Sequence, residues 1–207
     1  VEVIAGNANA NTITVNQGDL LAGGTVSGGD NTDTLVLAAA DTTLDLSSTT
    51  LSSVEVILGN SNANTITVNQ GDLASAGTVD GGAQTDTLAL VASETTLDLS
   101  STALSSVEVI LGNSNANTIT VNQADLLSGG SVDGAEDTDT LALAAGDAAL
   151  DLSSTTLTSV EVISGNAVAN TITVNQADLL SGGTVDGGGA TDTLALVSGE
   201  TALDLSS

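Results

Sequence analysis

The chain has 207 residues, of which 26 are acidic and none is Lys, Arg or His, so its formal charge is −26. It also lacks Cys, Pro, Met, Phe, Trp and Tyr. These absences exclude Ser-His and Cys-His nucleophile systems, disulfides, and thiolate or imidazole metal sites. A chain without cations is also not expected to bind nucleic acid or anionic lipid.

The motif Val-Glu-Val-Ile divides the chain into equal repeats. It opens at Val1, Val54, Val107 and Val160, so the spacing is 53 residues each time. The repeats therefore span 1–53, 54–106, 107–159 and 160–207, and no linker or change of composition separates them. Such a pattern predicts one continuous repeat domain over residues 1–207.

Within the first repeat, apolar residues alternate with small polar ones, as in Thr12–Val15, and this period of two predicts strands. Gly6-Asn7 and Gly28-Gly29 mark turns between them. Gln17–Ala22 resembles a helix but is too short to predict one. A further strand is expected at Leu44–Ser47. The longest apolar run, Leu35–Ala40, is far too short to cross a membrane, so no membrane insertion is expected.

A smaller repeat lies inside each unit, because Gly6–Val15 resembles Gly28–Leu37 at an offset of 22 residues. The equivalent Asn64 follows Asp33 by 31 residues. We therefore predict an all-β, right-handed parallel β-solenoid (β-helix) with about two rungs per repeat, one of 22 and one of 31 residues, and seven or eight rungs in all. Three rungs of about 18 residues are the alternative division. Four separate small domains are disfavoured because one repeat without aromatics, disulfides or a visible metal cage holds too little core.

The glycine-rich turns carry a family resemblance. The run Gly187–Ala195 resembles the calcium-binding nonapeptide of RTX proteins, Gly-Gly-x-Gly-x-Asp-x-U-x, except that Ala190 stands at the fourth position. Gly81–Ala89 and Gly28–Val36 match equally well, whereas Gly134–Leu141 also loses the second glycine. More degenerate forms begin at Gly6, Gly59, Gly112 and Gly165.

The resemblance to RTX proteins implies a secreted bacterial protein that binds calcium. It implies a structural segment of an extracellular filament, adhesin stalk, surface layer or biofilm matrix fibre. Enzymatic activity is not expected, because the chain has no aromatic residue to hold a sugar ring and no cation to hold an acidic polymer. The expected partners are further copies of the chain, or more repeats of a longer chain, and divalent cations. The alternative is a binding module that recognises ice or a calcium-dependent partner.

The acidic residues of these turns are the candidate metal ligands. Carboxylate and carbonyl oxygens at a glycine-rich turn suit calcium. The ligands predicted first are Asp33, Asp86, Asp139 and Asp192, with a second oxygen from Asp80, Asp133 and Asp186; the first repeat has Ser27 at that place. The competing interpretation is a solvated turn, in which Asp bonds to its own backbone. The rung alignment predicts alternation of Asn11, Asp33, Asn64 and Asp86 along one corner, which keeps like charges apart.

Three other patterns have simpler structural interpretations. The Asn residues are expected to form a hydrogen-bonded stack. The Thr-x-Thr pairs, such as Thr12 and Thr14, resemble the ice-binding face of antifreeze solenoids but are also typical of exposed strands. Glu2 and its equivalents, between two valines, are expected to point outward. Because no capping repeat is visible, we expect the ends to be covered by a longer chain or another copy.

Overall fold

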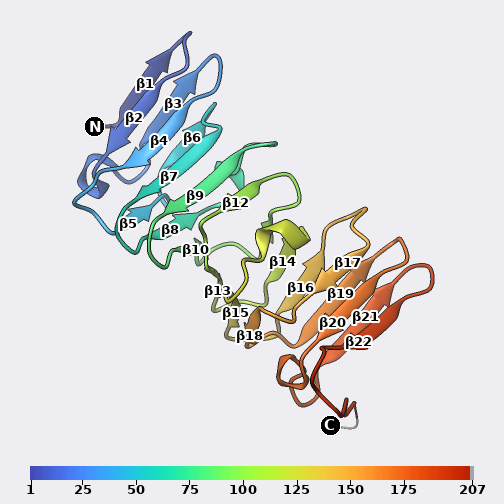
Figure 1. The fold of residues 1–207 in the computed structure, drawn as a ribbon. Coiled ribbons are helices and arrows are strands. Elements are labelled where there is room, and N and C mark those ends of the chain that lie inside the picture. Colours follow the sequence, from blue (N-terminus) through green and yellow to red (C-terminus); the bar gives the residue numbers. More distant parts are fainter. Residues whose placement is uncertain (206–207) are drawn as a thin grey trace. The chain divides into compact units, whose positions relative to one another are not determined.

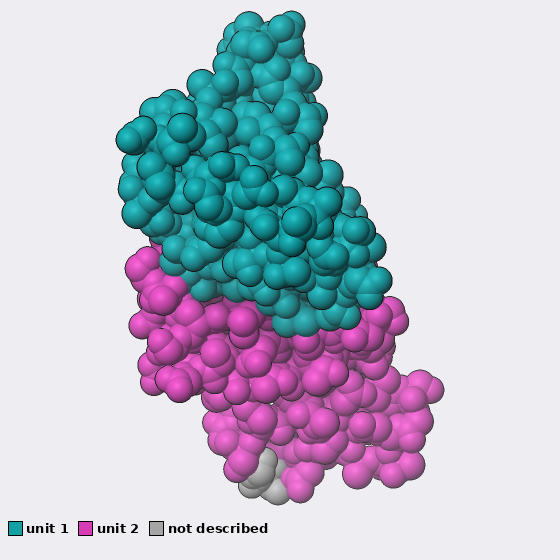
Figure 2. All heavy atoms as spheres, turned by 90° about the vertical axis from the view of Figure 1, so that its left-hand side faces the viewer, with its two compact units in different colours: residues 1–91, 101–109 teal, residues 92–100, 110–207 magenta. Residues whose placement is uncertain are grey.

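The computed structural model describes residues 1–205 and confirms an all-β parallel β-solenoid, with about nine turns. No α-helix occurs in this described part of the chain. The residues group into two compact units, which are described separately: unit 1 comprises 1–91 and 101–109, and unit 2 comprises 92–100 and 110–207 (Figure 2). One continuous body over 1–207 stays a prediction.

Unit 1 contains three sets of parallel strands, and within each set the strands lie side by side (Figure 1). The first set is β1 (Val3–Asn7), β3 (Thr25–Gly29) and β6 (Thr50–Ser52). The second set is β2 (Thr12–Val15), β4 (Thr34–Leu37), β7 (Val56–Asn60), β9 (Thr78–Gly82) and β12 (Ala103–Ser105). The third set is β5 (Thr43–Asp45), β8 (Thr65–Val68) and β10 (Thr87–Leu90).

Unit 2 repeats this arrangement. One set is β11 (Thr96–Asp98), β14 (Thr118–Val121), β16 (Thr140–Leu143), β19 (Val162–Asn166) and β21 (Thr184–Gly188). A second is β17 (Ala149–Asp151), β20 (Thr171–Val174) and β22 (Thr193–Leu196), and a third contains β15 (Ser131–Ala135) and β18 (Thr156–Thr158). β13 (Val109–Asn113) begins at the last residue of unit 1. Short 3-10 turns lie at η1 (Gln17–Asp19), η2 (Gln70–Asp72), η3 (Gln123–Asp125) and η4 (Gln176–Asp178).

The register corrects the predicted rungs. Paired residues are 22 apart, as in Thr12–Thr34 and Thr34–Val56, except that the short strands β6, β12 and β18 pair at 25, as in Thr25–Thr50. None of these strand pairs within residues 1–205 is offset by 31 or by 18 residues. A turn of about 22 residues gives each 53-residue repeat slightly more than two turns, which is why the chain has about nine rather than seven or eight.

The core follows from the alternation along the strands. Most inward residues of the three main strand motifs are buried: Ile57, Ile66 and Leu88 are each at most 2% exposed, whereas Val56, the second valine of its V-E-V-I motif, is only half-buried. Each such side chain stabilises the fold by about 1.5–3 kcal/mol relative to exposure. Small aliphatic side chains therefore fill the interior without any aromatic residue.

A glutamine side chain covers one edge of the first strand in the sets that begin with β5 and β17. The Gln17 Nε2 donates to the Asp45 carbonyl (3.1 Å), and the Asp45 N–H donates to the Gln17 Oε1 (2.6 Å). Asp45 lies in β5, the first strand of its set, and Gln123 bonds Asp151 of β17 in the same manner. The glutamine amide bonds the backbone of Asp45 as a neighbouring strand would. Leu44–Ser47 therefore starts a new sheet and is not an extra strand within a longer rung.

Candidate functional site: the polar corners

Two kinds of polar corner connect the strands. We call the four turns that end at Asp33, Asp86, Asp139 and Asp192 the Asp corners, and the four that end at Asn11, Asn64, Asn117 and Asn170 the Asn corners. All four residues of the Asp set occur in turns that resemble the RTX nonapeptide. Each polar side chain sits just before a strand, so the strand fixes its position.

The backbone of the Asp corner explains its glycine pattern. In the second repeat, Gly82 and Gln84 have φ angles of 103° and 75°, at the second and fourth positions of the nonapeptide. The equivalent pair in the third repeat is Ala135 and Asp137, with φ of 82° and 67°. This left-handed region favours glycine and costs other residues about 1–2 kcal/mol. The turn therefore requires this pattern for conformational reasons alone.

In three of the four Asp corners, hydrogen bonds join three polar residues on consecutive turns, and we call each such series a ladder. The Asn64 N–H donates to the Asp86 Oδ1 (2.6 Å), and the Asp86 N–H donates to the Glu108 Oε2 (2.8 Å). Consecutive members are 22 residues apart, which matches one turn. The same bonds join Asn11, Asp33 and Glu55, and Asn117, Asp139 and Glu161; Asn170 bonds Asp192.

This ladder corrects two predictions. The expected alternation of Asn11, Asp33, Asn64 and Asp86 is wrong, because Glu55 rather than Asn64 lies one turn after Asp33. The glutamate at the V-E-V motif also does not simply point outward: in three repeats it is half-buried and bends over the Asp corner. Glu55 follows Asp33 by 22 residues, which is the offset of the smaller repeat, so this spacing was the sequence signal that could have predicted the contact.

The Asp corner contains a buried oxygen without a partner. Asp33, Asp86 and Asp139 are 0% exposed, and their Oδ2 atoms have no hydrogen-bond partner. A Cβ at Gly28 would lie 2.5 Å from the Asp33 Oδ2 and 1.9 Å from the Ser53 carbonyl oxygen. Two acceptor oxygens thus border the small space that glycine leaves. A proton on the carboxyl or a cation would remove their repulsion.

Burial also changes the acidity of these groups. Desolvation raises the pKa of the Asp86 and Asp139 carboxyls above the ordinary 3.8, with smaller contributions in the same direction from Glu108 and Asp80, and from Glu161, Asp137 and Asp133. The hydrogen bond from the backbone of Asn64 or Asn117 opposes the shift. The environment therefore favours the protonated acid.

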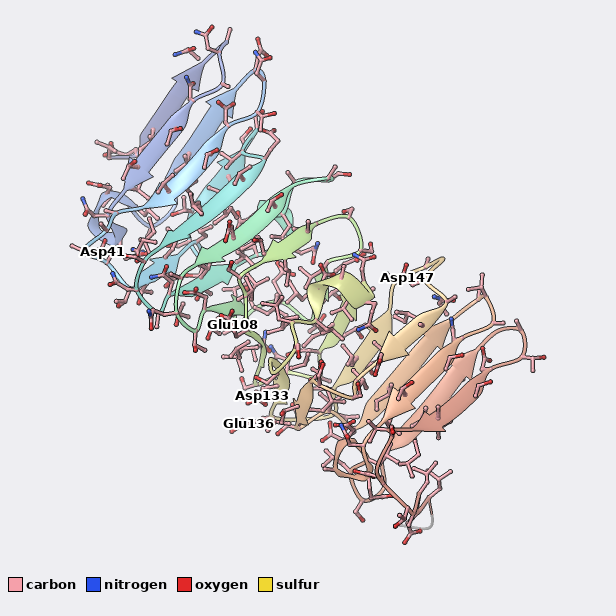
Figure 3. All side chains as sticks on the ribbon, viewed as in Figure 1. Asp41, Glu108, Asp133, Glu136 and Asp147 are labelled. Atoms are coloured by element: carbon pink, nitrogen blue, oxygen red, sulfur yellow. The ribbon has the colours of Figure 1, made fainter. Side chains whose placement is uncertain are left out.

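The predicted second ligands lie near but are engaged in their own turns. The Asp80 Oδ1 accepts from the Gly82 N–H (3.0 Å), and Asp133 and Asp186 accept equivalently from Ala135 and Gly188. Figure 3 labels Asp133, in the middle of β15, and Glu136, in the turn that follows this strand. Within residues 1–205, no three acidic side chains gather as a metal cage. The oxygen donors suit a hard cation, but calcium at these seven aspartates stays a prediction.

The Thr pairs do not form a regular array. In unit 1, one outward column is Thr43, Thr65 and Thr87, while the next column is Asp45, Thr67 and Ala89. Only the middle strand of the three therefore presents two threonines. This arrangement favours the simple exposed-strand interpretation.

No protein-family model, curated protein or solved structure matches the chain. Over residues 1–205, no helix has the length and apolar character needed to span a bilayer.

Proposed function

We propose that the chain is a structural repeat segment of an extracellular bacterial filament, adhesin stalk, surface layer or biofilm matrix fibre. The observation that carries this proposal is the in-register parallel pairing within each unit, in which the same strand types recur at 22-residue steps. Such pairing puts backbone hydrogen bonds in series along one direction, which suits a load-bearing element.

Composition and turn sequence support the remaining parts of the proposal. The resemblance of the Gly-rich turns to RTX proteins supports a secreted bacterial origin. The charge of −26 keeps copies apart in solution, and divalent cations could bridge them. A non-enzymatic role is favoured because the sequence has no His, Cys or Lys to serve as base or nucleophile.

Electron microscopy of the purified chain, with and without calcium, tests this role. We expect elongated particles that associate end to end or side by side. Compact particles that never associate under either condition would contradict it.

The unpartnered Oδ2 in the Asp corners favours a second candidate, a calcium-dependent binding module. Its proposed ligands are Asp86, Asp139 and Asp192, with Asp80, Asp133 and Asp186, and the site at Asp33 fills last because Ser27 replaces the second aspartate.

Titration calorimetry with millimolar calcium tests the second candidate. We expect heat that Asp86→Asn reduces and that Asp30→Asn, at an exposed position of the equivalent turn in the first repeat, leaves unchanged. No heat would remove the metal interpretation. If monovalent salt alone then raised stability, charge screening would be the cause.

A further inference from the structure

The three strand sets of unit 1 are three sides of one coil. Along the chain, β4 lies in the second set, β5 in the third, β6 in the first and β7 again in the second. Because Thr34 of β4 pairs with Val56 of β7, this circuit takes 22 residues. Each set is therefore one side of the same turn, and its outward residues form a surface of their own.

The length of the repeat moves each strand type from one side to the next. Two turns of 22 residues leave nine of the 53 residues in a repeat, and nine residues also separate the starts of β3, β4 and β5, at Thr25, Thr34 and Thr43. Accordingly, β1 lies in the first set and its equivalent β7 in the second, while β2 lies in the second and β8 in the third. In unit 2, β14 and its equivalent β20 also belong to different sets. Successive repeats thus present equivalent residues on different sides.

All three sides of unit 1 are nearly neutral, although the chain carries a charge of −26. Asp45 and Asp80 are the acidic residues within the strands of this unit, and its other acidic residues lie in the turns. One outward column of each side consists of Ala5, Ser27 and Ser52 on the first, Thr14, Val36 and Leu58 on the second, and Asp45, Thr67 and Ala89 on the third.

The exposure of these columns belongs to the sides and not to the ends of the sets. Ser27, Val36 and Thr67 lie in β3, β4 and β8, each of which has a strand on both sides, and all three residues are half-buried. The alternate residues face the core, as Leu35 does at 0% exposure. Small, uncharged outward side chains are typical of the centre of protein interfaces, where charged residues are depleted.

We propose that copies of the chain pack side by side through these neutral sides, and that each of the three sides can serve. This inference rests on the proposed structural role and deepens it, because it names the partner and the surface. A second copy fits because it brings the same uncharged side chains, whereas a cationic partner would be attracted to the acidic turns and an anionic partner repelled by them. Since the repeats carry equivalent residues to different sides, such contacts extend into a bundle.

One added charge on each side tests the proposal. Ser27→Glu, Val36→Glu and Thr67→Glu each place a carboxylate in the middle of a different side, and Ser61→Glu adds the same charge at an exposed turn as a matched control. Sedimentation in about 0.5 M NaCl, where charges are screened within several ångströms, measures the association. Each side variant should lower the association constant by roughly 2- to 5-fold, the size of one unfavourable exposed charge contact. The triple variant should lower it further, and Ser61→Glu should leave it unchanged.

A charge pair between copies gives a second measurement, and circular dichroism confirms that each variant is folded. Copies with Val36→Lys mixed with copies with Ser27→Glu should associate more strongly than either variant alone, because the second side of one copy can meet the first side of another. Mixing Val36→Lys with Ser61→Glu should give no such gain.

Three results would overturn the proposal. Loss of association in only one of the three side variants would show a single dedicated face, and an equal loss in Ser61→Glu would show general charge repulsion. A chain that stays monomeric at every concentration would reject the proposal together with the structural role. Fibres seen by microscopy whose lateral association is unchanged in all three side variants would retain the structural role and reject only this contact.

Discussion

The Asn corner at 59–64 and the Asp corner at 81–86 each bury one polar side chain in a turn, but the two side chains differ in their hydrogen bonds. The Asn64 Oδ1 accepts from the Asn60 N–H (2.7 Å), and its Nδ2 donates to the Asn60 Oδ1 (3.2 Å). The Asp86 Oδ1 accepts from the Asn64 N–H (2.6 Å), but its Oδ2 has no partner. Both side chains are at most 2% exposed.

The difference shows that a polar side chain buried in such a corner needs a hydrogen-bond partner for each of its polar atoms. An amide carries both a donor and an acceptor, so it satisfies the surrounding backbone without any outside group. A carboxylate only accepts, and burial makes its charge costly. Protonation therefore favours the Asp corner, whereas the Asn corner is neutral without it.

The largest expected effect comes from giving the Asn corner the chemistry of the Asp corner. Asn64→Asp removes the donor to Asn60 and buries a second carboxylate one turn from Asp86. We expect the free energy of unfolding at neutral pH to fall by about 3–5 kcal/mol, as for an uncompensated buried charge. Urea denaturation measures it. Ser61→Asp, which adds a charge at an exposed position of the same corner, should change stability by less than about 0.5 kcal/mol. Equal losses would contradict the comparison.

A change of pH should alter the Asp corners next most strongly. Burial raises the pKa of Asp86, Asp139 and Asp178 in the folded chain above the ordinary 3.8. Between 3.8 and the raised values the folded state binds more protons than the unfolded state, so the free energy of unfolding falls as the pH rises through this window. The contribution is fully present below 3.8. Urea denaturation at a series of pH values should show this slope, and Asp86→Asn should reduce it more than Asp30→Asn does.

At a fixed neutral pH, Asp86→Asn should convert the Asp corner into a neutral corner. The amide retains an acceptor for the Asn64 N–H and supplies a donor on the side of the Ser106 carbonyl. We expect thermal denaturation to show stabilisation by about 1–2 kcal/mol, the order of one buried unsatisfied polar group. A destabilised variant in metal-free buffer would mean that the charged carboxylate itself is favourable there.

The smallest effect concerns the backbone of the same corner. Ala135 has φ of 82°, where its counterpart Gly82 has 103°. Ala135→Gly should stabilise the third repeat by about 1 kcal/mol because it relieves the left-handed strain. Gly82→Ala should do the reverse and lose more, since its Cβ would lie 2.2 Å from the Asn60 carbonyl oxygen. Equal melting temperatures for the Ala135→Gly variant and the natural chain would show that no strain is stored there.

Local patterning was sufficient for the strands and their parallel stacking. The alternation in Thr65–Val68 and Thr87–Leu90 predicts strands with inward Ile66 and Leu88, and their pairing follows from the similarity of the two segments. The length of the turn was not predictable from that similarity alone. Leu44–Ser47 looked like extra length within a rung, because the role of Gln17 as a substitute strand depends on contacts 28 residues away.

The candidate site was predicted only in part for the same reason. Its aspartates were identified from their turns, but Glu55 and the Ser53 carbonyl join them only once the 22-residue register is known. The orphan Oδ2 results from tertiary burial, which a single turn sequence does not specify.

The most direct test of the Asp corner is to follow the Asp86 carboxyl carbon by NMR as the pH changes, in chelator-treated buffer. Comparison with the Asp86→Asn spectrum assigns the signal. If burial and the unpartnered oxygen control this corner, the carboxyl titrates at a midpoint clearly above the ordinary pKa of 3.8. A midpoint at or below 3.8 would contradict the account, because the corner would then stabilise the bare carboxylate without a proton or a cation.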